Sequence, residues 1–160
     1  MKKIVKYILI IIVIAFTFLI ARSYIIKKIY PLEYKEEIFQ YSSEFDVDPY
    51  LVSAIIWVES KYDKTALSDK GAVGLMQVMP ETGQWIAKKI GYDGYMESML
   101  SSPEVNIRFG CWYISYLDER FGGKRAHISA AYNGGPNRVA AWIDDERYSE
   151  NRELVNIPIK

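Results

Sequence analysis

The sequence predicts a mainly α-helical domain over residues 37–160, preceded by a transmembrane helix. Six segments after Pro31 show helical spacing of apolar residues or the signals that start and stop helices. No segment alternates apolar and polar residues far enough to build a large sheet, which leaves room for at most a small β-hairpin near residues 67–79. A long apolar stretch near the N-terminus predicts the transmembrane helix.

The apolar stretch at the N-terminus is typical of a membrane anchor. Apart from Thr17, every residue from Ile8 to Ala21 is apolar. A span over residues 7–26 is long enough to cross a bilayer if the Arg22 side chain extends toward the headgroups. A cleaved signal peptide is the alternative, and it also leaves the rest of the chain outside the membrane.

The basic residues before this stretch favour a cytoplasmic N-terminus. We therefore expect residues 1–6 to form a cytoplasmic tail and residues 7–26 a single-pass signal anchor. Residues 27–36 would be a juxtamembrane linker, and residues 37–160 a catalytic domain on the extracytoplasmic side of the cell membrane.

Charge is divided unevenly along the chain. The whole sequence contains 20 Lys and Arg and 20 Asp and Glu. Six of the basic residues and none of the acidic ones lie in residues 1–30, so residues 31–160 keep 14 basic and 20 acidic residues, a net charge of −6. A neutral total argues against a nucleic-acid-binding protein. One Cys and one His exclude an internal disulfide and argue against a Cys- or His-based metal site, so we expect no metal and no cofactor.

The first two helices of the domain are predicted from spacing and from a start signal. Between Leu32 and Phe45, apolar residues recur at intervals of three and four, which indicates a helix. Asp48 followed by Pro49 is a typical helix start, with Asp as the N-cap. The helix from Pro49 to Lys61 is apolar on almost every side, which predicts that it is central and buried.

Four further helices are predicted from proline and glycine signals. Residues 63–79 between the second and third helices show no helical pattern. The four predicted helices run from Pro80 to Gly91, from Pro103 to about Phe121, from Lys124 to Asn133, and from Pro136 through Trp142.

Several residues with potential chemistry are interpreted as structural. Cys111 is expected to be a small buried residue and His127 a helix-surface residue. The four tryptophans occupy apolar helix positions and are expected in the core; they are Trp57, Trp85, Trp112 and Trp142.

Glu59 is the candidate for acid–base chemistry. Val52, Ile55 and Ile56 lie seven, four and three positions before it, so Glu59 shares the apolar face of the helix. Loss of water and the negative end of the helix dipole both disfavour its charged form, which predicts a raised pKa. A carboxyl that keeps its proton suits a general acid. The alternative is an ordinary acidic residue at a helix end that reaches solvent.

The sequence also contains four short motifs in order: Glu59-Ser60, Gly74-Leu75-Met76-Gln77, Asn106-Ile107-Arg108-Phe109-Gly110 and Ala131-Tyr132-Asn133-Gly134-Gly135. In this order and at these separations they resemble the catalytic domain of soluble-type lytic transglycosylases, which are relatives of goose-type lysozyme. The resemblance covers residues 37–158 and implies a lysozyme-like helical fold.

The resemblance implies roles for six residues. Glu59 would be the single catalytic acid/base. The implied substrate-binding residues are Ser60, Met76, Gln77, Tyr132 and Asn133. In the family the hydroxyl after the catalytic Glu helps to orient the substrate or the acid, and the tyrosine hydroxyl lies near the carboxyl. Asn106 and Gly110 match a motif that we interpret as mainly structural.

The implied activity is cleavage of peptidoglycan, so the expected partners are glycan strands and, through the anchor, the membrane. The β-1,4 bond between N-acetylmuramic acid and N-acetylglucosamine would break without water and leave 1,6-anhydromuramic acid ends. A hydrolytic goose-type lysozyme and a non-catalytic peptidoglycan-binding assembly protein are the alternatives.

Two features near the proposed site bear on these alternatives. Hydrolysis of glycosidic bonds usually needs two carboxylates, and Asp63 and Asp69 lie nearest to Glu59 in the sequence. We expect Asp63 to brace its loop and Asp69 to be a turn residue. Family members continue after an Ile-Pro pair with a further helix that lines the site, whereas this sequence reaches only Lys160, so that helix is expected to be missing.

Overall fold

The computed structural model describes the backbone of residues 2–29 and 33–157, and the chain divides into two units, Met1–Glu33 and Tyr34–Lys160. The predicted linker lies partly outside the described residues, as does the predicted helix start at Leu32. The position of the family's C-terminal helix, expected to be missing, also lies outside them. The second unit contains every residue predicted for the site.

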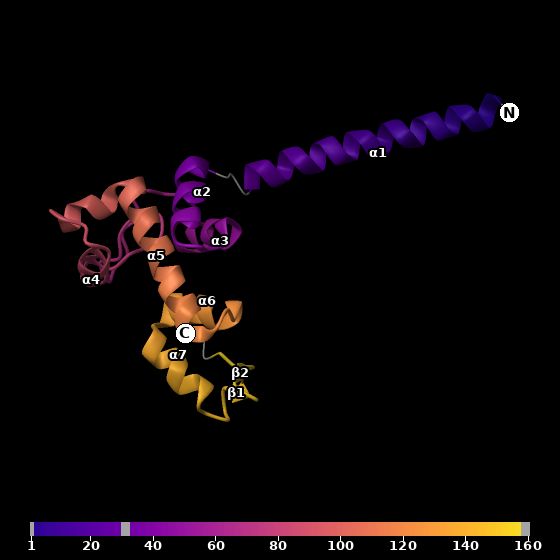
Figure 1. Ribbon diagram of the computed structural model, residues 1–160. Helices are drawn as coiled ribbons and strands as arrows, with labels where there is room; N and C mark the ends of the chain where they lie inside the picture. Colours follow the sequence, from indigo (N-terminus) through magenta and orange to yellow (C-terminus); the bar gives the residue numbers. More distant parts are fainter. Residues whose placement is uncertain (1, 30–32, 158–160) are drawn as a thin grey trace. The chain divides into compact units, whose positions relative to one another are not determined.

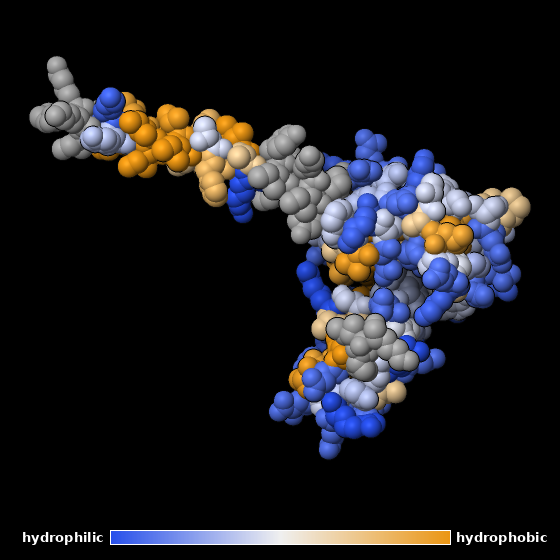
Figure 2. Space-filling view, turned by 180° about the vertical axis from the view of Figure 1, so that it is seen from behind, coloured by the Kyte–Doolittle hydropathy of each residue, from blue (hydrophilic) through white to orange (hydrophobic). Residues whose placement is uncertain are grey.

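The first unit is built on α1 (Lys2–Ile29). The large apolar side chains from Tyr7 to Ile20 are 43–67% exposed, and Figure 2 shows them as a hydrophobic band along this helix. Within the described parts of the chain, no helix has the length and apolar character needed to cross a membrane. The anchor over residues 7–26 therefore remains a prediction.

The second unit is mainly helical, as predicted (Figure 1). Its helices are α2 (Lys35–Glu44), α3 (Pro49–Ser60), α4 (Pro80–Ile90), the 3-10 helix η1 (Glu97–Ser101), α5 (Pro103–Phe121), α6 (Arg125–Gly134) and α7 (Pro136–Ile143). A two-stranded antiparallel sheet follows, made of β1 (Ser149–Glu150) and β2 (Glu153–Leu154). All six helices expected after Pro31 are present, with small differences at their ends.

Helix boundaries follow from local chemistry. The Asp48 side chain caps α3 by accepting a hydrogen bond from the Tyr50 backbone N–H at 2.8 Å, and Pro49 occupies the first turn, where no N–H is needed. Gly91 and Gly122 end α4 and α5 in the left-handed conformation, with φ of 65° and 60°. Glycine adopts this conformation without a steric penalty.

The helix α5 lies at the centre of the second unit. It packs against α2, α3, α4, α6 and η1, so most of its circumference is covered (Figure 1). Ile107, Phe109, Ile114 and Leu117 on this helix are at most 1% exposed. This buried helix is the scaffold against which the other helices are positioned.

The prediction that α3 is buried on almost every side is wrong for one face. Val52 and Ile56 are fully buried, but Val58 is 69% exposed. The cause is that α3 packs mainly against α2 and α5, and two neighbouring helices cover only part of a helix surface. The end of α3 that carries Glu59 therefore has one face in the core and another open to solvent.

The small hairpin is present, but its predicted position is wrong. Residues 67–79 form only two isolated bridges, Leu67–Val73 and Val73–Val78. The two-stranded sheet lies instead after α7, with Ser149 paired to Leu154 and Glu150 paired to Glu153. Strands of two residues are too short to show an alternating pattern.

The structure also corrects the interpretation of His127, which is 2% exposed rather than on the helix surface. Its ring packs edge-on against Phe121, and burial lowers its pKa. Phe121 ends α5 whereas His127 lies in α6, and helical spacing within one helix does not reveal a contact between two helices. Cys111 is fully buried, as predicted. The four tryptophans are partly buried and pack against the core.

Candidate active site

Glu59 lies in the last turn of α3 and is partly buried. Burial raises its pKa above the ordinary glutamate value of 4.5, and no charged or hydrogen-bonding group among the described residues contributes to the shift. The direction of the predicted shift is thus confirmed, and its cause is loss of water around the carboxylate. A carboxyl in this position keeps its proton to higher pH than a free glutamate does.

This raised pKa predicts a pH-dependent difference in stability between the wild-type protein and Glu59→Gln. The contribution of Glu59 is fully present below pH 4.5 and is lost as the pH rises through its folded-state pKa. Glutamine does not titrate, so the melting temperature of Glu59→Gln should rise relative to wild type between pH 4 and pH 8. Thermal unfolding followed by circular dichroism measures this difference.

Glu119→Gln, which changes an exposed carboxyl on α5, is the matched control for that series. Its difference from wild type should vary less with pH than that of Glu59→Gln. Equal pH dependence for the two variants would show that burial does not perturb Glu59.

Ser60 connects the end of α3 to a distant backbone segment. Its hydroxyl donates to the Leu75 carbonyl oxygen at 2.8 Å and also lies 3.1 Å from the Ile56 carbonyl oxygen. The residue is 9% exposed. The hydroxyl is therefore occupied by backbone carbonyls, an arrangement that positions the neighbouring Glu59 rather than presenting a free group to a ligand.

Asn106 on α5 holds the same backbone segment from the other side. Its side-chain oxygen accepts from the Met76 N–H at 2.7 Å, and its amide nitrogen donates to the carbonyl oxygens of Val73 at 2.8 Å and Leu100 at 2.9 Å. Gly74 lies against this amide, and a Cβ at Gly74 would be 2.6 Å from the Asn106 nitrogen. We call residues 73–77 the site loop. It is fixed by this buried hydrogen-bond network and by Gly74, whose φ is 77°.

The Met76 side chain lies beneath the loop. It is fully buried, and a Cβ at Gly110 would overlap its sulfur atom. The absence of a side chain at Gly110 therefore lets the thioether pack directly against α5. Met76 also contributes its backbone to the site, because its carbonyl oxygen accepts a hydrogen bond from the Tyr132 hydroxyl at 2.9 Å.

Gln77 has a left-handed backbone with φ of 47°. Its amide nitrogen donates to the carbonyl oxygens of Gly74 at 3.0 Å and Ala66 at 3.2 Å, which turns the side chain back onto its own loop. These two contacts use both amide hydrogens and leave the side-chain oxygen as an acceptor.

Tyr132 on α6 interacts with the site loop through a hydrogen bond and with Glu59 through the charge of the carboxylate. Burial, and then the charge of Glu59, raises the pKa of Tyr132 well above its ordinary value. Its hydroxyl therefore stays protonated and donates to the Met76 carbonyl oxygen. The charge of Glu59 thus acts on the phenol, while the placement of the Tyr132 hydroxyl beside the carboxyl, which the family resemblance implies, stays a prediction.

A cavity of about 310 Å³ brings together three of the six predicted site residues, Gln77, Tyr132 and Asn133. Glu59, Ser60 and Met76 are not among the residues that line it. The cavity lining also includes residues that the sequence did not single out, among them Lys70, Thr82, Tyr113 and Arg138. A signal for the two basic ones was available, because each lies within two residues of a glycine or proline at a predicted turn.

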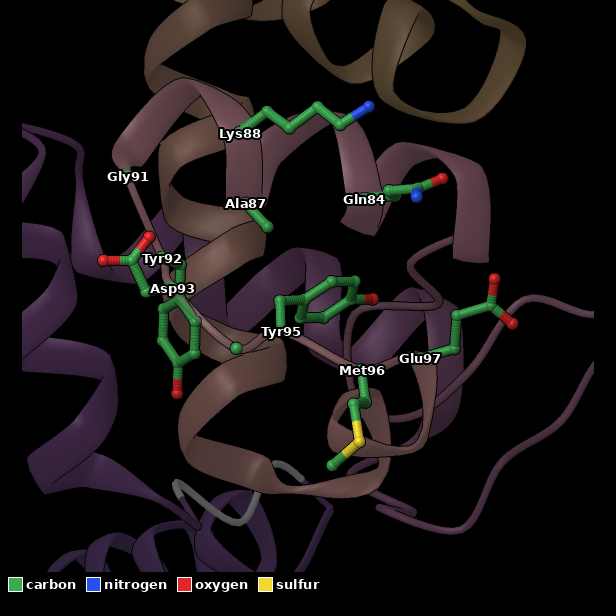
Figure 3. Close-up of a pocket in the computed structure, with 10 residues that line it drawn as sticks. Gln84, Ala87, Lys88, Gly91, Tyr92, Asp93, Tyr95, Met96 and Glu97 are labelled. Carbon is green, nitrogen blue, oxygen red and sulfur yellow. The ribbon is translucent and has the colours of Figure 1, made fainter.

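A larger cavity of about 520 Å³ lies beside α4 and the segment that follows it (Figure 3). Figure 3 shows Gln84, Ala87 and Lys88 from the helix together with Tyr95 and Met96 from the later segment. None of the six predicted site residues lines this cavity. Size alone does not identify a site, and we assign the candidate site to the smaller cavity because it contains the convergent predicted residues.

Asp63, a candidate for a second carboxylate, has surroundings that differ from those of Glu59. Asp63 accepts hydrogen bonds from the Thr65 N–H at 2.8 Å and the Thr65 hydroxyl at 2.7 Å, and these bonds lower its pKa. It thus braces its own loop, as expected. Within residues 2–29 and 33–157, no group of three His, Cys, Asp or Glu side chains is arranged to hold a metal ion.

A helical scaffold with a proton-holding carboxyl near a polar cavity is typical of a site for acid–base chemistry. The family comparison is more specific. Residues 36–155 match the family model described as the transglycosylase SLT domain. The chain belongs to this family.

Relatives and solved structures agree with this assignment. The chain is 37% identical over 115 residues to the soluble lytic murein transglycosylase of Escherichia coli K12, covering 71% of this chain and 18% of that protein. It is 34% identical to membrane-bound lytic murein transglycosylase C of Actinobacillus pleuropneumoniae, covering 67% of this chain and 32% of that protein. The chain thus matches between about a fifth and a third of these relatives' lengths.

The fold is similar to that of the 70 kDa soluble lytic transglycosylase of E. coli, with a TM-score of 0.73 and 35% identity. That match covers 77% of this chain and 20% of the other. A lytic transglycosylase from Pseudomonas aeruginosa, solved as an inactive mutant in which glutamine replaces a glutamate, matches with a TM-score of 0.72 and 33% identity, over 77% of this chain and 20% of that one. The similarity supports the predicted lysozyme-like fold.

Proposed function

We propose that this chain is a peptidoglycan lytic transglycosylase. It would cleave the β-1,4 bond between N-acetylmuramic acid and N-acetylglucosamine and leave 1,6-anhydromuramic acid ends. The observation that carries the proposal is the raised pKa of the partly buried Glu59, whose neighbour Ser60 is hydrogen-bonded to Leu75, two residues before Gln77 in the lining of the polar cavity. Family membership and the names of the relatives support the substrate class.

Glu59 would act first as an acid and then as a base. Its proton passes to the bridging oxygen, and the substrate's own acetamide can stabilise the positive charge at the anomeric carbon. The resulting carboxylate then takes the proton of the sugar's C6 hydroxyl as that oxygen attacks C1. One carboxyl is sufficient because no water is activated, and a group with both roles works best with a pKa near the working pH.

In this proposal, two of the five residues expected to bind substrate hold the site loop in place, and the other three line the cavity. Ser60 and the Met76 backbone hold the loop and Glu59 in position through their hydrogen bonds. Gln77 offers its side-chain oxygen to a sugar hydroxyl or N-acetyl group. Tyr132 and Asn133 line the cavity beside them.

Mass spectrometry of peptidoglycan digested by the full chain tests the proposal. Anhydromuropeptides are expected as products. Reducing ends would identify a hydrolytic goose-type lysozyme instead, and binding of the wall without any released product would identify a non-catalytic wall-binding protein.

We further propose that residues 7–26 anchor the chain, with residues 37–160 on the extracytoplasmic side of the cell membrane. Support comes from the apolar stretch between Ile8 and Ala21, from the basic residues before it, which favour a cytoplasmic N-terminus, and from the relatives named membrane-bound. Alkaline carbonate extraction tests this. The full chain should stay with membranes and a chain without residues 1–30 should not; equal behaviour would contradict the anchor.

A further inference from the structure

The lining of the cavity that contains Gln77, Tyr132 and Asn133 carries a net positive charge. Two basic residues, Lys70 and Arg138, are among its lining residues, and no acidic residue is. Residues 31–160 as a whole carry a net charge of −6. A pair of cations without an acidic partner, in a domain of the opposite net charge, is therefore a local feature of the cavity.

Lys70 and Arg138 reach the cavity from two different elements. Lys70 is at the tip of a turn that is closed by hydrogen bonds from Gly71 N–H to Ser68 O at 2.9 Å and from Ala72 N–H to the Ser68 hydroxyl at 2.9 Å. Arg138 is in the first turn of α7. Ordered backbone on both sides keeps the two cations at the cavity.

Neither cation is neutralised by the protein itself. Several other basic residues of the second unit pair with carboxylates, for example Arg108 with Glu44 at 2.6 Å and Arg125 with Asp48 at 2.7 Å. In the described part of the chain, no salt bridge involves Lys70 or Arg138. Both are exposed and free to meet an anion.

Two uncharged polar side chains of the cavity are already bonded to the protein. The Tyr132 hydroxyl donates to Met76 and the Gln77 amide donates to its own loop. Hydrogen bonds from charged donors are about twice as strong as those from neutral ones, so the two cations are the strongest donors available to a ligand. Cations in a concave site raise the local concentration of anionic ligands and favour their binding.

We propose that Lys70 and Arg138 are specificity-determining residues that bind a carboxylate carried by the muramic acid residues of the glycan strand. This inference rests on the proposed function, because it concerns the substrate of the same site. Carboxylates of the required chemistry come from two sources. One source is the lactyl group when no stem peptide is attached, and the other is the stem peptide.

Steady-state kinetics of Lys70→Gln/Arg138→Gln on three substrates tests the inference. The substrates are intact strands, strands stripped of stem peptides by an amidase, and strands whose carboxyl groups have been amidated with carbodiimide. The variant should raise KM on the preferred anionic substrate about threefold to tenfold, as expected for exposed ionic contacts, with kcat within about twofold of wild type. On amidated strands wild type and variant should have equal KM values.

The substrate on which wild type and variant differ identifies the source of the carboxylate. A difference on stripped strands indicates the lactyl group, and one on intact strands indicates the stem peptide. The wild-type KM should also rise more steeply with salt than that of the variant, because salt screens exposed charges.

Lys88→Gln/Lys89→Gln on α4 removes the same charge from exposed positions that do not line this cavity. This control should keep the wild-type KM. Equal KM values and salt dependence for wild type and Lys70→Gln/Arg138→Gln on all three substrates would overturn the inference. So would an equal loss in the α4 control, which would indicate an effect of net charge alone.

A binding measurement separates this inference from the proposed reaction. In a Glu59→Gln background, cosedimentation with intact or stripped wall should weaken about threefold to tenfold when Lys70 and Arg138 are also replaced. If the wild-type chain cleaves nothing while this loss is seen, the proposed reaction fails and the cation site stands. If cleavage is seen without any effect of the two cations, the reaction stands and the cation site fails.

Discussion

Glu59→Gln is expected to lower kcat on peptidoglycan by about 100- to 10,000-fold, the usual contribution of a general acid or base. Glutamine is nearly the same size but has no proton to give to the bridging oxygen. Stability should not suffer, because Glu59 is partly exposed and no described hydrogen bond or salt bridge involves its carboxyl. Release of soluble muropeptides measures kcat, and circular dichroism shows whether the variant is folded.

Asp69→Asn is the informative comparison for that variant. Asp69 was one of two candidates for a second carboxylate, and it is exposed in its turn. With a single acid/base, kcat of Asp69→Asn should stay within about twofold of wild type. A folded Glu59→Gln variant with kcat close to wild type would contradict the assigned role of Glu59, and a large loss in Asp69→Asn would indicate a two-carboxylate mechanism.

Asn106→Leu is expected to lower the free energy of unfolding by about 3–5 kcal/mol. Leucine has a similar size but removes the hydrogen bonds from Asn106 to the Met76 N–H and the Leu100 carbonyl oxygen, and one of the two bonds that the Val73 carbonyl oxygen accepts. The Asn106 side chain is 1% exposed, so water cannot easily replace it. For a domain of this size the melting temperature should fall by roughly 10 °C or more.

Asn137→Leu provides the matched control on α7. Asn137 is exposed, and its side-chain oxygen accepts a hydrogen bond from the exposed Arg120 at 2.8 Å. Its loss should change the free energy of unfolding by less than about 1 kcal/mol. Chemical denaturation of both variants gives the two values. Similar values would show that the buried network around Asn106 contributes little.

Much of the fold follows from local sequence. The Asp48-Pro49 start and the glycines that end α4 and α5 act within one helical turn, so the sequence alone reveals them. The position of the small sheet was missed because two-residue strands carry no periodic signal. The burial of His127 was missed because it involves Phe121 of the preceding helix, and spacing within one helix does not reveal contacts between helices.

In the candidate site, too, local features could be predicted from the sequence and long-range contacts could not. The raised pKa of Glu59 could be predicted because the sequence places this residue on the apolar face of its helix, and burial is the cause of the shift. The hydrogen bonds of Asn106 reach residues 30 and 33 positions away, and no spacing rule reveals such contacts. The interpretation of Asn106 as mainly structural agrees with these hydrogen bonds. Its partners in the site loop, Val73 and Met76, became visible only in the structure.

The most direct test is the pKa of the Glu59 carboxyl, measured on the full chain by ¹³C NMR with its signal assigned from the Glu59→Gln spectrum. If burial at the end of α3 holds the proton, the carboxyl should titrate clearly above 4.5, and its midpoint should match the alkaline limb of the kcat/KM profile. A Glu59 carboxyl that titrates at or below 4.5 would contradict the proposed role of this residue as a general acid.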